Sequence, residues 1–359
     1  MADLLLRFPK LDAWEQGEEQ PTLRQLEHFA QAVHVPVGYL FLPTPPEERL
    51  PIPDFRTPAG QSILRPSPNL LDTIHACQEK QAWYREFAQY TKQAEVAFVG
   101  SATVHTPPEA VALQMGRTLN FDLEDRRTCR NWEESLRYFC IHAEQAGVLV
   151  MVNGVVGNNT KRKLDPEEFR GFSLADRLAP LVFINGNDTK AARMFTLAHE
   201  LAHLWLGTTA LSDMGAAPRP GQRIEEVWCN KVAAEYLVPA ETLASEFDAN
   251  ELLDEALKRL GNFFKVSSLV VLRRLLDTGK IDRSRFDAAW GAEIRRFRKA
   301  RSGGGDFYKT TMTRTSRRFA RALAESTLEG QTLYRDAFRM LGINKTEIFM
   351  NIAREVGLQ

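Results

Sequence analysis

The chain has 359 residues, and its 46 Lys and Arg residues balance 46 Asp and Glu residues. This balance excludes a globally basic nucleic-acid coat and an acidic tail protein, although a local charged patch remains open. Hydrophobic residues make up 44% of the chain, which is enough to bury a core, and the length allows two or three domains.

Neither a membrane segment nor a secretory signal is evident in the sequence. No uninterrupted apolar run reaches about 18 residues, and the N-terminus lacks a basic start followed by a long apolar run. The cysteines are far apart and form no CxxC pair, which fits free thiols in a reducing compartment: Cys77, Cys129, Cys140 and Cys229. We therefore expect a cytoplasmic protein with no membrane partner.

The first third of the chain divides at a proline-rich stretch. Residues 1–43 are predicted to be a small helical module, in which Thr22 and Gln25 form a capping box at the start of a helix. Residues 44–68 are predicted to be a linker, because their prolines prevent regular structure. An aromatic-rich helix is expected from residue 69 to about residue 93.

The middle of the chain has the pattern of an α+β domain. Residues 146–152 and 180–185 are short apolar runs typical of buried strands. Asp188 or Thr189 can cap a helix that reaches Leu206 and ends at Gly207, and a second helix is expected over 224–237 after a Gly/Pro-rich loop at 215–221.

From residue 250 the chain is predicted to be mostly helical, with a flexible break at 302–306. We predict a mostly helical α+β protein with a small antiparallel or mixed sheet packed on the helix at 189–206. The expected units are 1–43, the linker 44–68, a catalytic domain at 69–245 and a helical region at 246–359.

His199, Glu200 and His203 form an HExxH motif on that helix. Residues four apart lie on one helix face, so both imidazoles can bind one ion, and Glu200 can act as general base on a water at that ion. The helix is apolar nearly all round, and polar groups in a core are costly unless they have partners. A chance occurrence of the motif is the alternative reading.

The third metal ligand is expected from the helix at 224–237. Glu226 would be the anionic ligand, and Asn230, one turn later, can accept the outer N–H of a ligating histidine. Glu225 is the rival ligand, and Cys229 is interpreted as a buried structural thiol. Two histidines and one glutamate leave a position open for water, which is typical of a catalytic zinc site.

These segments resemble the ImmA/IrrE family of gluzincin-type metallopeptidases. The matching parts are the stretch from Phe195 to His203, the second helix with Glu226 and Asn230, and the strand that ends at Asn185. The resemblance implies that His199, His203 and Glu226 bind Zn²⁺, that Glu200 is the base and that Asn230 is their hydrogen-bonding partner.

The same resemblance implies a protein substrate held in extended form along a sheet edge. Residues 181–184, with Val182, Phe183 and Ile184, are the candidate edge strand, and an ordinary core strand is the alternative. The substrate expected from the family is a transcriptional repressor encoded nearby, cut to control stress, mobile-element or toxin–antitoxin genes. Tyr236 is a candidate for stabilising the oxyanion.

The N-terminal module resembles the latter part of an Xre-type helix-turn-helix domain, through residues 9–17 and 21–26. Too few residues precede Pro9 for the helix that reads DNA, so we do not expect this chain alone to bind nucleic acid. Ten basic residues between Arg295 and Arg321 are interpreted as a solvated face or a docking surface for an acidic partner.

The leading hypothesis is a zinc-dependent endopeptidase that cleaves a partner protein. The rival hypothesis is a non-catalytic regulatory or antitoxin-like binding protein that keeps the peptidase fold as a scaffold. Glu200 discriminates between them, because a scaffold has no need of the base.

Overall fold

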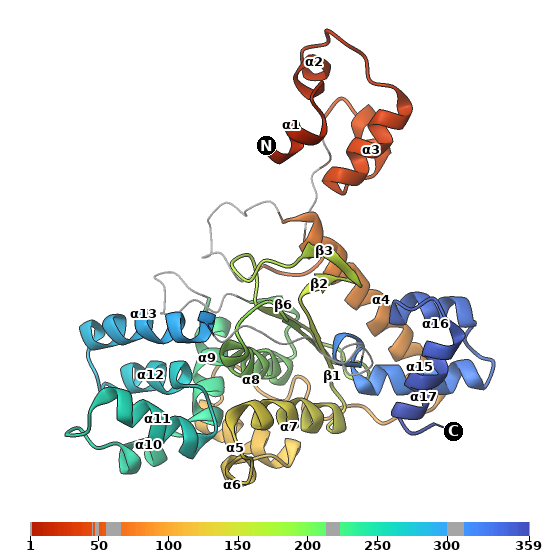
Figure 1. Ribbon diagram of the computed structural model, residues 1–359. Coiled ribbons are helices and arrows are strands. Elements are labelled where there is room, and N and C mark those ends of the chain that lie inside the picture. Colours follow the sequence, from red (N-terminus) through yellow and green to blue (C-terminus); the bar gives the residue numbers. More distant parts are fainter. Residues whose placement is uncertain are drawn as a thin grey trace.

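The computed structural model describes residues 2–44, 46, 50–54, 66–212, 223–299 and 312–358. A small four-stranded sheet lies at the centre, and helices cover both of its faces (Figure 1). This arrangement confirms the predicted α+β fold with a small mixed sheet. The expected loop at 215–221 and the expected break at 302–306 lie outside the described residues. Within the described part of the chain, no helix combines the length and apolar character needed to cross a membrane.

The N-terminal module has its own small aromatic core. Phe8 packs against Trp14 and Phe29, with ring centroids 6.3 and 5.3 Å apart. The side chain of Thr22 caps the third helix together with Gln25, which confirms the predicted capping box. The elements of the module are α1 (Ala2–Arg7), α2 (Leu11–Glu15), α3 (Leu23–Val33) and the 3₁₀ helix η1 (Val37–Phe41).

The central sheet has the strand order β1-β5-β4-β6. Its strands are β1 (Leu149–Asn153), β4 (Gly171–Leu174), β5 (Leu181–Asn185) and β6 (Ala210–Leu211). β1 runs parallel to β5, whereas β4 is antiparallel to both β5 and β6. A separate hairpin is formed by β2 (Val155–Val156) and β3 (Asn159–Lys163). The alternation of side chains along the strands sends successive residues to opposite faces of the sheet.

One face of the sheet packs on helix α8 (Lys190–Leu206), which carries the HExxH motif. Val150, Val182 and Ile184 enter this core with Leu197 and Leu201 of α8. The surrounding helices are α5 (Pro108–Leu119), α6 (Leu123–Arg127), α7 (Trp132–Gln145), α9 (Ile224–Leu237), α10 (Ala240–Glu246), α11 (Leu253–Phe264), α12 (Ser268–Asp277) and α13 (Arg283–Lys299).

The opposite face packs on the long helix α4 and on the C-terminal helices. Met151, Phe172 and Phe183 point into this second core, where they join Leu70 of α4 and Phe319 of α15. These elements are α4 (Pro68–Tyr90), α15 (Arg317–Leu328), α16 (Tyr334–Leu341) and α17 (Thr346–Glu355). Helix α4 and the C-terminal helices therefore share one hydrophobic core.

The expectation that residues 181–184 form an edge strand is wrong. β5 is paired on both sides, with β1 on one and β4 on the other, so its main chain has no free edge for a substrate. Val182 and Ile184 are fully buried toward α8, and Phe183 is buried on the other face. The alternative reading of an ordinary core strand is the one the structure supports.

Candidate metal centre

Helix α8 is held at both ends by local sequence signals. Of the two candidate caps, Thr189 is the N-cap, and its hydroxyl accepts a hydrogen bond from Ala192 N at 3.2 Å. Gly207 ends the helix with a positive φ of 70°. A Cβ at Gly207 would lie 2.9 Å from Gly100 Cα, so both the dihedral angle and the close approach of the backbone require glycine.

The structure brings His199, His203 and Glu226 together in the core between α8 and α9. His203 Nε2 lies 3.1 Å from Glu226 Oε1, and His199 Nε2 lies 3.3 Å from Glu226 Oε2. The two Nε2 atoms are 3.1 Å apart. All three side chains are fully buried, and they form a compact group of metal-ligand type.

The three side chains are placed as the ligands of one divalent ion would be. Two ligand atoms at about 2.0–2.1 Å from a tetrahedral ion stand about 3.3 Å apart, and each histidine Nε2 lies 3.1–3.3 Å from one of the two Glu226 carboxylate oxygens. Both carboxylate oxygens of Glu226 and Nδ1 of His199 lack a hydrogen bond of normal geometry within the described structure. Buried polar atoms rarely remain unsatisfied, so the donor set fits a bound divalent ion.

Burial and charge act in opposite directions on the three side chains. Burial raises the pKa of Glu226, but the two histidines outweigh it and lower that pKa to about 2. Burial lowers the pKa of His203 below its usual range. Burial also opposes the charged form of His199, but Glu226, Glu200 and Asn230 together raise its pKa. An anionic carboxylate between two imidazoles is the charge state in which this donor set binds cations.

Glu200 lies beside this group without joining it. Its side chain is fully buried and its Oε2 accepts a hydrogen bond from Ser212 Oγ at 3.2 Å, while its Oε1 has no partner of normal geometry in the described structure. Burial raises the pKa of Glu200 to about 8, against the lowering effects of His199, Ser212 and Ser173. A cation held nearby would favour the charged carboxylate instead.

Strand β4 packs closely against α8 next to Glu200, and Gly171 makes this contact possible. A Cβ at Gly171 would lie 2.7 Å from Thr196 Cγ2, 2.9 Å from the Phe183 carbonyl oxygen and 3.2 Å from Glu200 Oε1. Ser173, two residues along the strand, points to the same side and donates to Thr208 O at 3.3 Å. The sheet therefore forms the wall of the site on the Glu200 side.

Two polar residues contact the outer parts of the histidines. Thr208 Oγ1 lies 3.1 Å from His203 Nδ1 and donates to His203 O at 3.3 Å. The one proton of this hydroxyl is used in the bond to His203 O, so toward Nδ1 the hydroxyl oxygen can only accept, and Nδ1 carries the ring proton. Nε2 then has its lone pair free, directed toward Glu226. Asn230 lies beside His199 on the α9 side, where its side chain raises the His199 pKa.

Several other residues considered from the sequence lie outside the group. Glu225 is half-buried and is not among the converging ligand atoms. Tyr236 is directed elsewhere, because its hydroxyl donates to Phe121 O at 2.6 Å, so it does not face the candidate centre as an oxyanion donor. Cys229 is fully buried, and burial raises its thiol pKa far above the usual value.

Sequence reasoning missed the residues that surround the motif, namely Gly171, Ser173, Thr208 and Ser212. Thr208 directly follows the helix-ending Gly207, and this adjacency is a signal that the sequence did offer. The other three lie in a four-residue strand or directly after a two-residue strand. Such short elements have no periodicity that distinguishes them from loops.

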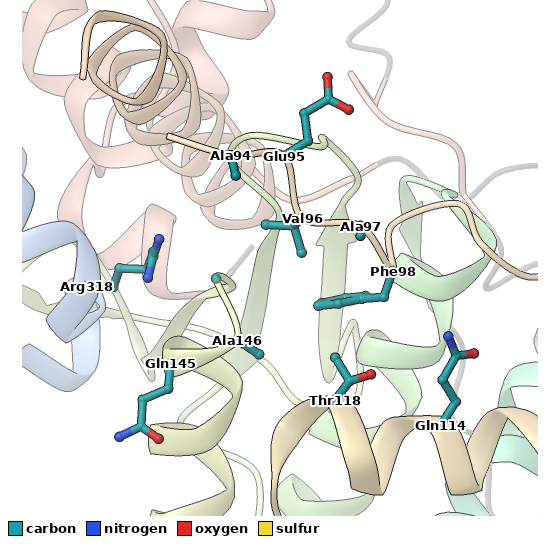
Figure 2. A pocket seen from close by; sticks show the side chains of 11 residues that line it. Ala94, Glu95, Val96, Ala97, Phe98, Gln114, Thr118, Gln145, Ala146 and Arg318 are labelled. Atoms are coloured by element: carbon teal, nitrogen blue, oxygen red, sulfur yellow. The ribbon is translucent and has the colours of Figure 1, made fainter. Parts of the chain in front are cut away.

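A separate pocket of about 400 Å³ opens elsewhere on the protein (Figure 2). Its wall includes Val96, Phe98 and Ala146, with Gln114 and Arg318 among the polar residues around it. None of its lining residues belongs to the His–His–Glu group. Phe98 also stacks on Trp205 of α8, with ring centroids 4.0 Å apart.

The predicted basic segment is only partly described, because residues 300–311 lie outside the described residues. Three of its arginines contact other parts of the protein. Arg314 donates to Asn158 Oδ1 at 3.2 Å. Arg318 donates to Tyr84 Oη at 2.7 Å, and Arg317 donates to the carbonyl oxygen of Glu355. The contacts of Arg318 and Arg317 join α15 to α4 and α17.

Comparisons with known proteins place the candidate centre inside a peptidase family match. Residues 143–276 match the Peptidase_M78 family, described as the IrrE N-terminal-like domain, and this stretch contains His199, His203 and Glu226. Residues 315–355 match a domain of unknown function (DUF8813). No curated protein and no solved structure gave a match. The first match supports the resemblance to the ImmA/IrrE family over a little more than a third of the chain and supports a metallopeptidase-like role there.

Proposed function

We propose that this protein is a zinc-dependent endopeptidase that cleaves a partner protein. The observation that carries the proposal is the convergence of three buried side chains whose ligand atoms lie within 4.8 Å of one another, with the carboxylate of Glu200 beside them. The family match over residues 143–276 supports a hydrolase acting on peptide bonds. From the resemblance, the partner is a transcriptional repressor encoded nearby, as in stress, mobile-element or toxin–antitoxin control.

His199, His203 and Glu226 would hold the ion, with Thr208 and Asn230 fixing the histidine rings. A bound Zn²⁺ would supply a Lewis acid that polarises the scissile carbonyl and makes water more acidic. Glu200 takes a proton from the attacking water on a carboxylate oxygen and delivers it to the leaving amine. Ser212 restrains Glu200 for both steps through its hydrogen bond to Oε2.

A comparison of Glu200→Gln with wild type tests the proposal, because this change removes the base and leaves the ligands. The substrates are dye-labelled casein and a co-expressed small repressor from the neighbouring gene. The expected result is an unchanged zinc content with at least a hundredfold loss of cleavage. If both proteins leave both substrates equally intact, the endopeptidase proposal is wrong and the scaffold hypothesis takes its place.

The third ligand is tested by Glu226→Ala, with Glu225→Ala as the matched control one residue away. We expect Glu226→Ala to weaken zinc binding at least a hundredfold and Glu225→Ala to leave it unchanged. Equal zinc affinity in the two variants would show that Glu226 is not a ligand. A competitive titration against a zinc-binding dye measures both affinities.

A further inference from the structure

The sheet edge nearest to the candidate centre is the outer edge of β6. β4 packs over α8 at Glu200, as the contacts around Gly171 show, and β6 pairs with the other side of β4. The residue after β6 is Ser212, whose hydroxyl donates to Glu200 Oε2. An extended peptide added to this edge would therefore pair with the residues directly before Ser212, which is the hydrogen-bond partner of the proposed base.

That edge is already covered by the chain itself. Leu211 N donates to Pro53 O at 3.0 Å, and Asp54 forms an isolated parallel bridge with Leu211. The side chain of Ile52 is only 5% exposed and belongs to the same buried apolar cluster as Phe172 and Leu211. A main-chain hydrogen bond together with an anchored side chain is how peptides bind by strand addition.

The segment is suited to be displaced by another peptide. Pro51 and Pro53 flank Ile52 and have no N–H group, so at these positions the segment can accept hydrogen bonds but cannot donate them. A peptide with N–H groups at the corresponding positions can form a fuller ladder with β6. Pro51 and Pro53 are exposed, which leaves Ile52 as the apolar anchor of this part of the segment.

We infer that residues 51–54 occupy the strand position of an extended protein substrate and thereby block the enzyme until they are displaced. This inference rests on the proposed function and adds a substrate feature to it. The substrate would contribute an extended segment whose apolar side chain enters the site that Ile52 fills. It would also donate backbone N–H groups where the segment has prolines.

The test uses Ile52→Asp in the full-length protein to release residues 51–54 from the edge of β6. Its matched control is Ile343→Asp, which alters a residue of the same apolar cluster in the C-terminal helical region. The first probe is a dye-labelled synthetic peptide with the sequence of residues 49–56, followed by fluorescence anisotropy. The second is the hydrolysis of labelled casein. Ile52→Ala removes the anchor without adding a charge and covers the case in which Ile52→Asp does not fold.

The expected result is that Ile52→Asp or Ile52→Ala binds the peptide at least tenfold more tightly than wild type or Ile343→Asp. The same variants should hydrolyse casein at least tenfold faster than wild type, and the peptide should suppress this gain. Equal peptide binding by all the proteins overturns the inference, and so does tighter peptide binding by the Ile52 variants when they hydrolyse casein measurably but no faster than wild type. If no variant shows hydrolysis that depends on Glu200, the proposed function is wrong instead. Peptide binding is measured without hydrolysis, so it still shows whether residues 51–54 cover the edge of β6.

Discussion

Thr208 offers a sharp test of how the protein prepares a histidine for metal binding. The change Thr208→Val keeps the shape of the side chain and removes its hydroxyl. In the wild type, Thr208 Oγ1 lies 3.1 Å from His203 Nδ1 and donates its one proton to His203 O. The valine would leave Nδ1–H buried without this partner and would free the ring to take the other tautomer.

The expected loss follows from these contacts. Removing the partner of a ligating histidine typically weakens metal binding by about 10- to 100-fold, which corresponds to about 1.4–2.7 kcal/mol. An unsatisfied buried donor costs about 1–3 kcal/mol, which is the same range. The predicted zinc dissociation constant of Thr208→Val is therefore about 10- to 100-fold above that of wild type.

Competitive titration of zinc against a chromogenic chelator at pH 7 measures this change. Thr209→Val is the matched control, because Thr209 Oγ1 accepts from Ala175 N at 2.9 Å and so contacts the sheet rather than a histidine. We expect the control to stay within about threefold of wild type. The reasoning is refuted if Thr208→Val binds zinc as tightly as wild type, or if both variants weaken binding equally.

Three further predictions concern the packing around the centre and its attachment to the rest of the fold. Gly171→Ala should push β4 away from Glu200, because the added Cβ would clash with its neighbours. Chemical denaturation should show a loss of about 1–3 kcal/mol in the free energy of unfolding, and casein hydrolysis should fall by up to about a hundredfold. Arg126→Met should cost about 3–5 kcal/mol in denaturant unfolding, because the buried guanidinium donates to the carbonyl oxygens of Tyr236, Leu237 and Phe264; a loss below 1 kcal/mol would contradict this. Burial raises the pKa of Glu144 to about 7, although Ser316 and the first residues of α15 donate hydrogen bonds to it. Because this pKa lies above the unfolded value, Glu144 adds fully to the free energy of unfolding below about pH 4.5, and this contribution is lost as the pH rises to about 7. Between pH 4.5 and 7, the free energy of unfolding of wild type should therefore fall by on the order of 3 kcal/mol relative to that of Glu144→Gln. A stability difference between the two proteins that does not change with pH would contradict this.

The sequence was sufficient to predict the two helices of the centre. Thr189 and Gly207 define α8 because helix caps are local signals, and the four-residue spacing of His199 and His203 fixes their common face. The second helix was predicted over 224–237, and the structure has α9 at the same residues. Both elements depend on interactions within a few residues of each other, which a single sequence can reveal.

The order of the strands could not be predicted in the same way. The apolar run at 181–185 has the same composition whether it lies at an edge or in the middle of a sheet. Its central position depends on β4, whose four residues begin with Gly171 and have no marked pattern. The strand-like pairing of Asp54 was hidden for the opposite reason, because the prolines around Ile52 indicate a linker.

X-ray absorption at the zinc edge, on full-length protein loaded with one equivalent of zinc, tests the central claim most directly. The account predicts two nitrogen ligands and at least one oxygen ligand at about 2.0–2.2 Å, and loss of this signal in Glu226→Ala. A sulfur ligand at about 2.3 Å, which would point to Cys229, or an unchanged spectrum in Glu226→Ala would contradict it.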